Sequence, residues 1–440
     1  MNQSNPTFSA GIYTLGCKVN QYESEAMAEA LAKEGVTILP PNRVCDAYII
    51  NTCTVTAESD RKARQFIRRA IAKNPEAYIA VTGCLAETDP EGLAAIEGVD
   101  IVVGNTEKMA VVRELLRLFQ KNEKPLSPMV HHPSMESAPF EPMRISAFGR
   151  TRAYVKIEDG CENHCTYCII PSARGSVRSK PMREVIDEVA LLTEGGCREV
   201  VLTGIETASY GRDLPKGDLA SLLEAVNAIP NIGRIRLGSL DPSLIREGFV
   251  KRIAPLASVT PHFHLSLQSG SSRTLAAMKR KYNADQARAA MALLRREMPR
   301  VKFTTDVIVG FPGETEEDFL ETLRFVEEER FLMVHIFPYS KRRGTPAERM
   351  PNQVPGEVKR ERLHRLEAVA ERVRREILEE EIRQHPLTEV LFETCKDGMA
   401  YGHTDDFLEV AVPSPCPLSG TLRAVRLTHT DGNLCFGELL

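Results

Sequence analysis

Three cysteines that lie close together in the sequence have the strongest potential for chemistry. Cys161, Cys165 and Cys168 are spaced C-x3-C-x2-C within the stretch DGCENHCTYC. Three thiolates in one loop can hold one side of a 4Fe–4S cluster, which needs four ligands, so one iron is left open for another molecule. Tetrahedral zinc is the rival, but no fourth Cys or His follows at a zinc-finger distance, and His164 is constrained inside the loop. The spacing therefore predicts an iron–sulfur site with an open iron.

A second set of three cysteines is dispersed along the first hundred residues. Cys17, Cys53 and Cys84 each end a predicted strand, in YTLGC, IINTC and AVTGC. The carboxyl ends of parallel strands lie at one edge of a sheet, where open α/β folds bind ligands. Three thiols placed in this way could meet at one point. The alternative is three small buried apolar residues, a common use of cysteine, but the same placement in three successive units favours a second metal site.

The elements that must position these cysteines alternate between strand and helix. We expect strands at 11–15, 46–52, 78–83 and 101–104, with helices at 21–34, 58–73 and 110–121 between and after them. Alternation of this kind predicts parallel strands joined by right-handed crossovers. Residues 8–121 are therefore expected to form a Rossmann-like α/β domain. Residues 122–147 carry five prolines and little periodicity, and they are expected to be a linker.

From residue 148 the same alternation resumes at greater length. The expected strands lie at 153–157, 199–204, 234–239, 262–267, 303–310 and 333–339. The expected helices lie at 182–194, 218–227, 243–253, 271–279, 284–297 and 315–329. Six such units predict a partial (β/α)6 barrel of the TIM type, and a charged helix at 356–384 should pack on its surface, so that this domain spans 148–384. Residues 386–440 change to short alternating runs that predict a small β-barrel.

The composition is that of a multidomain globular chain. Of the 440 residues, 42% are hydrophobic and 26% are charged, and the net charge is −4. No run of 18 apolar residues is present, which argues against a membrane helix, and MNQSNPTFSAGIY lacks the features of a secretory signal. We therefore expect a cytoplasmic protein with no membrane partner. In a reducing compartment, eleven clustered cysteines indicate metal or redox chemistry rather than disulfides.

Together, the two cysteine sets and the three expected domains resemble the radical S-adenosylmethionine methylthiotransferases. The resemblance covers nearly the whole chain, and the tail at 386–440 is similar to the TRAM-like RNA-binding barrel that ends these enzymes. It implies two 4Fe–4S clusters and S-adenosylmethionine as cofactors. Cys161, Cys165 and Cys168 would then hold the cluster that binds S-adenosylmethionine. Cys17, Cys53 and Cys84 would hold an auxiliary cluster, which is the expected carrier of the inserted sulfur.

The short sequence motifs around the cysteines distinguish the branches of this family. LGCKVNQYESE (15–25), NTCTVTAESDRKARQ (51–65) and the stretch 154–180 look most like the branch that acts on threonylcarbamoyladenosine. That branch inserts a methylthio group at carbon 2 of the adenine at position 37 of tRNA, next to the anticodon, using one S-adenosylmethionine as methyl donor and one as radical source. The isopentenyladenosine branch typically reads GCQMN, and the branch that modifies a ribosomal-protein aspartate reads GCPKN; this chain matches neither. A two-cluster electron carrier is the remaining alternative, and the missing fourth ligand at both sites argues against it.

The resemblance also implies contacts with the cofactor and with RNA. The TGIE turn, the QSG turn and the VIVGFPGET run follow barrel strands, where this fold places its active site. The residues expected to contact S-adenosylmethionine are Tyr167, Gly204, Glu206, Gln268, Ser269 and Gly310. Basic residues near the cysteines and in the tail could neutralise phosphates. The residues expected to contact tRNA are Arg64, Arg68, Arg69, Arg174, Arg178, Arg423 and Arg426.

Two features limit the expected RNA surface and the set of partners. The helix at 61–73 carries six basic residues in thirteen, but a solvated face is an equally good interpretation of it. The tail at 386–440 has a net charge of −5, so we expect it to bind RNA through a small basic surface, or through recognition of RNA shape and stacking on bases. Beyond tRNA, the chemistry implies an external one-electron reductant, such as a flavodoxin-like protein, and a sulfur donor.

Overall fold

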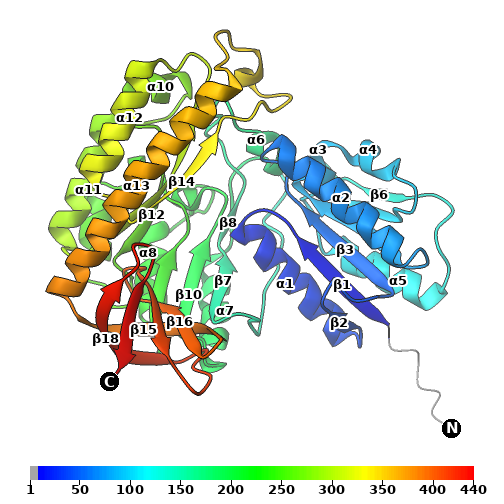
Figure 1. The fold of residues 1–440 in the computed structure, drawn as a ribbon. Helices are drawn as coiled ribbons and strands as arrows, with labels where there is room; N and C mark the ends of the chain where they lie inside the picture. The colour runs from blue at the N-terminus through cyan, green and yellow to red at the C-terminus, as the bar shows by residue number, and fades with distance from the viewer. Residues whose placement is uncertain (1–7) are drawn as a thin grey trace. The chain divides into compact units, whose positions relative to one another are not determined.

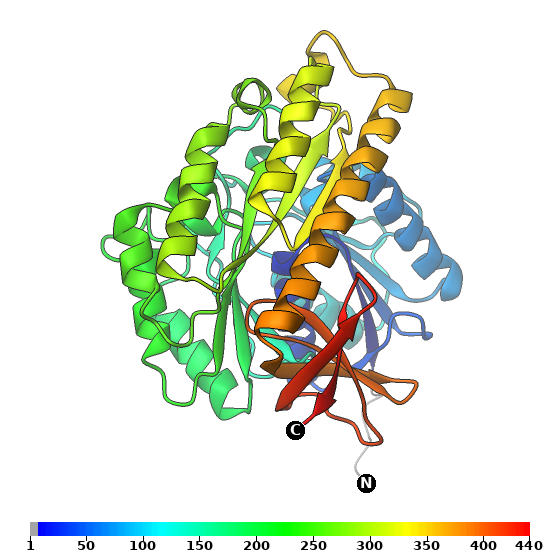
Figure 2. The same ribbon diagram turned by 60° about the vertical axis from the view of Figure 1, so that its left-hand side comes forward.

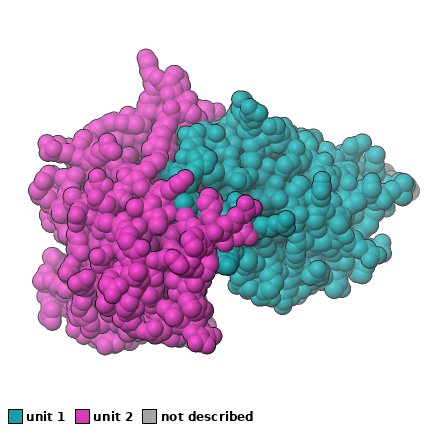
Figure 3. All heavy atoms as spheres, turned by 90° about the horizontal axis from the view of Figure 1, so that it is seen from above, with its two compact units in different colours: residues 1–147, 156–180, 340–345 teal, residues 148–155, 181–339, 346–440 magenta. Residues whose placement is uncertain are grey.

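A computed structural model describes residues 8–440, which divide into two compact units (Figure 3). The first unit extends up to residue 147 and also includes residues 156–180 and 340–345. The second comprises residues 148–155, 181–339 and 346–440. Within residues 8–440, no helix is both long enough and apolar enough to cross a bilayer.

The first unit is built on a six-stranded parallel sheet in the order β2-β1-β3-β4-β5-β6 (Figure 1). Its strands are β1 (Ser9–Thr14), β2 (Thr37–Leu39), β3 (Ala47–Thr52), β4 (Tyr78–Gly83), β5 (Ile101–Val103) and β6 (Met129–His131). Its helices are α1 (Lys18–Lys33), α2 (Ala57–Lys73), α3 (Cys84–Thr88), α4 (Pro90–Ala94) and α5 (Ala110–Lys121). Every residue of β3 and β4 is buried, because apolar residues of α1 and α5 cover one face and those of α2, α3 and α4 cover the other. The expected Rossmann-like α/β arrangement is therefore confirmed.

Two strands of this sheet were not expected. β2 is a three-residue edge strand paired with β1, and its short, partly exposed run has no periodicity long enough to read. β6 lies inside the proline-rich segment 122–147 and pairs in parallel with β5. The linker prediction missed β6 because three residues, Met129–His131, are too few to show alternation among the prolines. Part of that segment thus belongs to the sheet.

The second unit contains a partial barrel of six strands. One sheet has the order β7 (Arg152–Lys156), β10 (Glu199–Thr203) and β11 (Arg234–Leu237). The last residue of β7, Lys156, is assigned to the first unit. β12 (His262–Gln268), β13 (Lys302–Val309) and β14 (Met333–Pro338) form the other. Isolated parallel bridges link the two sheets by pairing Ile235 of β11 with Val259, just before β12, and Leu240, just after β11, with Leu265 of β12. The helices are α7 (Met182–Glu194), α8 (Leu219–Asn227), α9 (Glu247–Ile253), α10 (Ser272–Ala277), α11 (Ala284–Glu297) and α12 (Glu316–Glu329). The predicted partial (β/α)6 barrel is confirmed.

A long helix and a small closed barrel complete the second unit. α13 (Gly356–Gln384) lies along the barrel helices and reaches the C-terminal domain (Figure 2). That domain is a closed barrel in the order β15-β16-β17-β19-β18, as predicted. Its strands are β15 (Leu387–Lys396), β16 (Met399–His403), β17 (Glu409–Pro413), β18 (Leu422–Thr430) and β19 (Cys435–Leu439). Val373, Ile377 and Leu378 of α13 belong to its apolar core, so this helix also packs against the C-terminal barrel.

Candidate active site

The three dispersed cysteines lie after three neighbouring strands, β1, β3 and β4. Cys17 is the N-cap of α1, Cys53 directly follows β3, and Cys84 begins α3 directly after β4. The strand order places β3 between the other two, and in-register pairing aligns the strand ends. This common edge is the one expected from the position of each cysteine after a predicted strand. Burial, and then the nearby Cys84 and Cys17 thiols, raises the pKa of Cys53 to about 11, so the three thiols are close enough to oppose each other's ionisation.

A glycine makes the close approach of two of these cysteines possible. Gly16 has a φ of +99°, and a Cβ at this position would lie 2.8 Å from the Cβ of Cys53 and 3.1 Å from its Sγ. Any other side chain would therefore be strained by its backbone and would press on the Cys53 thiol. The Asn20 side chain donates to the carbonyls of Leu15 and Thr52, which ties the turn that carries Cys17 to the end of β3.

The second cysteine loop belongs to the same compact unit. The short strands β8 (Glu158–Asp159) and β9 (Arg178–Ser179) pair in antiparallel fashion and hold its two ends together. The amide of Cys161 donates to the carbonyl of Gly175 at 3.0 Å, and that of Cys168 to the carbonyl of Cys165 at 3.0 Å. Ile170 is the first residue of α6 (Ile170–Arg174), and its amide donates a hydrogen bond to the Cys168 Sγ at 3.5 Å. Backbone N–H groups aimed at sulfur are a means by which proteins tune iron–sulfur clusters.

A buried ionic network joins the two cysteine regions of this unit. The fully buried Arg174, which ends α6, donates to Glu23 Oε1 at 2.8 Å, to Asp159 Oδ1 at 3.1 Å and to the amide oxygen of Asn20. Its Nε lies 3.4 Å from the Cys84 Sγ. A single guanidinium therefore contacts α1, the start of the second cysteine loop and one of the dispersed cysteines.

Cations outnumber carboxylates in this network. Glu23 also pairs with Lys108 and Lys156, and Asp159 also pairs with Lys156 at 2.6 Å and with Arg178 at 3.6 Å. These cations hold the pKa values of Glu23 and Asp159 well below the usual range for carboxyl groups, against the opposing effect of burial. Buried charge is costly unless it is balanced, so two carboxylates facing four cations leave room for an anionic group beside Cys84. An iron–sulfur cluster held by three thiolates is such a group, and these residues fit it.

The sequence missed most of this network. Glu23 and Asn20 lie on the buried face of α1 together with Val19 and Met27, and polar residues at such positions were the only available signal. Arg174 and Arg178 were expected to contact tRNA, but both are buried and occupied by internal ion pairs. Their prediction as phosphate contacts is not compatible with this structure. A basic residue close to a cysteine motif does not reveal from sequence alone whether it faces solvent.

The remaining arginines expected to bind RNA are more accessible. Arg68 and Arg69 are exposed on α2, whereas Arg64 forms an ion pair with Asp89 and is only partly exposed. Arg423 and Arg426 are exposed on β18 of the C-terminal barrel. Of the arginines proposed for α2, two thus present free surface for a polyanion, and the third is engaged within the unit.

The residues expected to contact S-adenosylmethionine in the second unit lie at one end of its barrel. Gly204 and Glu206 follow β10, Gln268 ends β12 with Ser269 next, and Gly310 follows β13. All are therefore at the carboxyl ends of parallel strands, the face that carries active sites in this class of fold. Tyr167, the sixth expected residue, lies in the first unit between Cys165 and Cys168.

Local contacts shape this end of the barrel. The Ser269 hydroxyl lies 3.0 Å from that of Thr322, and the Gly310 amide donates to Glu314 Oε1 at 2.9 Å. Gly310 has a φ of +70°, and a Cβ there would lie 2.4 Å from Cγ of Lys359, so only glycine fits without displacement. Burial, and then the Asp241 carboxylate, raises the pKa of Glu206 to about 7.

Comparison with known proteins agrees with this geometry. Residues 155–326 match the radical SAM superfamily, and residues 9–104 match a family described as uncharacterized protein family UPF0004. The chain is 39% identical to a threonylcarbamoyladenosine tRNA methylthiotransferase, MtaB, of Bacillus subtilis, over 95% of this chain and 93% of that protein. It is 38% identical to the protein of the same name from Chlamydia pneumoniae, over 97% of each chain.

Two further proteins are less similar in sequence to this chain. A tRNA-2-methylthio-N(6)-dimethylallyladenosine synthase of Desulfitobacterium hafniense is 33% identical over 96% of this chain and 95% of its own. Among solved structures, the radical S-adenosylmethionine methyltransferase TsrM of Kitasatospora setae superimposes with a TM-score of 0.57 at 16% identity, covering 78% of this chain and 74% of that one. At this identity the structural match supports the fold alone.

Proposed function

The chain belongs to the radical S-adenosylmethionine methylthiotransferase family, and we propose that it inserts a methylthio group at carbon 2 of threonylcarbamoyladenosine at position 37 of tRNA. The observation that carries this proposal is the 39% identity, over 95% of the chain, to a relative named for that reaction. The relative named for dimethylallyladenosine is less similar, at 33%. Both cysteine sets that such an enzyme needs are present at the positions described above.

Two 4Fe–4S clusters and S-adenosylmethionine are the cofactors of this proposal. Cys161, Cys165 and Cys168 would hold the cluster that binds S-adenosylmethionine, and Cys17, Cys53 and Cys84 would hold the auxiliary cluster. When bound, these groups supply the one-electron chemistry that opens an unactivated C–H bond, together with the sulfur and methyl group that replace the hydrogen. No side-chain acid or base could open that bond.

The protein's own residues hold these groups in place. The Arg174 guanidinium donates toward the Cys84 sulfur and fixes Asp159 two residues before Cys161, so it orders both cysteine regions at once. The surplus of buried cations would offset the negative charge of a thiolate-ligated cluster. Glycine is required at position 310 because the Lys359 side chain fills the space beside it at the end of β13, and the Gly310 amide is oriented by the Glu314 carboxylate.

The partners and location of the protein follow from the same reaction. Arg68 and Arg69 of α2 and Arg423 and Arg426 of β18 are the arginines that we assign to tRNA phosphates. The reaction also requires an external one-electron reductant and a source of sulfur, and we place it in the cytoplasm with its tRNA substrate. For the chain as a whole we propose an α/β domain at 8–121 that is completed by β6 at 129–131, a radical SAM barrel with its helix at 148–384 and a TRAM-like barrel at 386–440.

Analysis of tRNA nucleosides tests the proposed reaction. A strain lacking the corresponding enzyme should regain 2-methylthio-threonylcarbamoyladenosine in its tRNA when it expresses this chain. It should gain no 2-methylthio-isopentenyladenosine in a background that lacks that activity too. Appearance of the methylthio-isopentenyl nucleoside instead would overturn the assignment to this branch.

Iron content tests the assignment of the cysteines. A triple variant, Cys17→Ala, Cys53→Ala and Cys84→Ala, should keep about half the iron after anaerobic reconstitution, because each cluster holds about four irons. It should still cleave S-adenosylmethionine but insert no sulfur. A Cys45→Ala variant is the control, since Cys45 is also a buried cysteine of the first unit. Full iron in the triple variant would mean that the three strand-end cysteines are only apolar core residues.

A further inference from the structure

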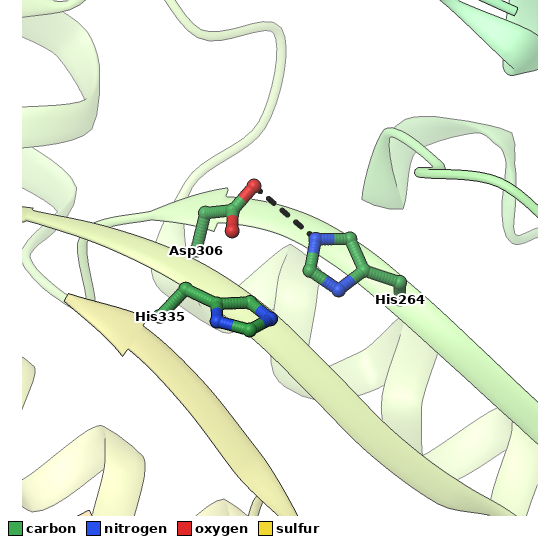
Figure 4. A group of neighbouring side chains, drawn as sticks. All are labelled: His264, Asp306 and His335. Atoms are coloured by element: carbon green, nitrogen blue, oxygen red, sulfur yellow. Dashed lines mark hydrogen bonds and ion pairs between the residues drawn. The ribbon is translucent and has the colours of Figure 1, made fainter. Parts of the chain in front are cut away.

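A group of potential metal ligands lies on neighbouring strands of the second unit and shares no residue with either cysteine set. His264 on β12, Asp306 on β13 and His335 on β14 point toward one another (Figure 4). The pairing register explains why: Asp306 is directly opposite His335, and His264 is opposite Thr304, two residues before Asp306 on the same face of β13. Three adjacent parallel strands therefore present these side chains together.

This group lies on the face of the sheet opposite to the one that carries Phe303, Val307 and Val309. Phe303, Val307 and Val309 of β13 alternate with Thr304 and Asp306 and are buried. In closed barrels of this type the inner face is filled by layers of bulky apolar side chains. Here His264 and Asp306 are only half-buried and His335 is exposed, so a polar wall accessible to solvent replaces that packing.

The ligand atoms have separations that suit a single cation. His264 Nε2 lies 3.2 Å from Asp306 Oδ2, and one ligand atom from each of the three residues lies within 4.8 Å of the others. Two nitrogens or oxygens that share a tetrahedral zinc at about 2.0–2.1 Å are separated by about 3.4 Å. The His264–Asp306 pair already has that spacing. The His335 ring already lies beside that of His264, with the ring centroids 5.9 Å apart, and its ligand atom is within 4.8 Å of the other two.

A further contact orients the central imidazole as metal sites require. His264 Nδ1 lies 2.9 Å from the Thr304 hydroxyl, which also lies 3.0 Å from His262 Nε2. Metal-bound histidines nearly always engage their second ring nitrogen in this way, which fixes the tautomer and the direction of the ring. With Nδ1 engaged by Thr304, Nε2 of His264 is the nitrogen directed toward Asp306 and His335.

From this arrangement we propose that His264, Asp306 and His335 form a binding site for a divalent transition-metal ion. Two imidazoles and one carboxylate favour zinc or iron(II) over magnesium or calcium, which prefer oxygen ligands. Three protein ligands leave at least one coordination position open for water or another oxygen donor. The site shares no residue with either cysteine set, and it stands independently of the proposed function.

Zinc content measured beside iron content tests this site. The full chain with its clusters reconstituted is dialysed anaerobically against buffered zinc, and both metals are counted by mass spectrometry. We expect one zinc per chain in addition to the cluster iron. His264→Gln, Asp306→Asn and His335→Gln should each lose the zinc and keep the iron. His403→Gln should keep both, because His403 is paired with Glu393 at 2.7 Å in the same unit without contributing to this group.

X-ray absorption at the zinc edge of the unmodified protein decides the question even if a variant fails to fold. Two imidazole nitrogens and one or two oxygens around zinc, with no sulfur, are the expected ligands. Sulfur around zinc would mean that the metal occupies cysteines, and the proposal would be wrong. Zinc that is absent from the unmodified protein, or that persists in all three variants, would equally overturn it and leave His264–Asp306 as an ordinary hydrogen-bonded pair.

Discussion

Replacing Arg174 with methionine removes the guanidinium that joins the two cysteine regions while keeping an apolar chain of similar length. The variant loses ion pairs to Glu23 and Asp159 and the hydrogen bond to Asn20. Breaking a buried ion pair by removing one partner typically costs about 3–5 kcal/mol. Lys156 remains within 2.8 Å of Glu23 and within 2.6 Å of Asp159, so neither carboxylate becomes an isolated charge. We therefore expect a loss of about 3 kcal/mol, at the lower end of that range.

Scanning calorimetry of the full chain without clusters measures this loss free of any contribution from bound iron. For a unit of this size, about 3 kcal/mol corresponds to a fall in Tm of roughly 6–12 °C. Arg174→Lys should fall between wild type and Arg174→Met, because lysine keeps the charge but not the planar set of donors. Arg61→Met, which removes an exposed pair with Glu58, is the control and should leave the Tm unchanged. A wild-type Tm for Arg174→Met would refute the role of this network.

Three further predictions concern α2 and the end of the barrel. Arg68→Gln should lower the slope of log affinity for tRNA against log salt by about 0.7–0.9, whereas Arg64→Gln should not, because Arg64 is already in an ion pair; equal slopes would contradict this. Burial raises the pKa of Glu206 to about 7 from its ordinary value of 4.5, so the native state binds an extra proton between these values and loses stability as pH rises through them. The free energy of unfolding in urea should therefore be measured for Glu206→Gln and for wild type at pH 5 and pH 8. The variant should be more stable relative to wild type at pH 8 than at pH 5. The same difference between the two proteins at both pH values would show that Glu206 does not titrate in this way. Gly310→Ala should be more destabilising than Gly313→Ala by about 1 kcal/mol or more in the same assay, since both have positive φ but only Gly310 faces a neighbouring side chain; equal losses would mean that crowding is not the cause.

The order of helices and strands could largely be predicted from the sequence, because the hydrophobic periodicity of this chain is strong. The helix expected at 356–384 has those bounds in the structure, and the six barrel strands fall within one or two residues of their predicted positions. The failures share one physical cause. β2 and β6 are three-residue strands that exist because a neighbouring strand offers hydrogen bonds, and their own residues do not encode them.

The residues of the candidate site could be predicted from the sequence only where the residue type itself indicates a metal ligand, as cysteine does. Six cysteines were selected by spacing and by position after strands, and the structure places the dispersed three at one sheet edge. The network around Arg174 was not readable, because it depends on burial contributed by residues more than a hundred positions apart in the sequence. A charged residue looks the same in a sequence whether it is solvated or enclosed among partners.

The most direct test of the proposed reaction is a competition in one tube. The reconstituted protein is given S-adenosylmethionine, a reductant, sulfide as the source of sulfur, and equal amounts of two anticodon stem-loops, one carrying threonylcarbamoyladenosine and the other isopentenyladenosine. Mass spectrometry of the digested RNA should detect a methylthio group, 46 mass units heavier by the exchange of H for SCH3, on the threonylcarbamoyl nucleoside alone. A methylthio group on the isopentenyl nucleoside, or 5′-deoxyadenosine formed with neither RNA modified, would contradict the account.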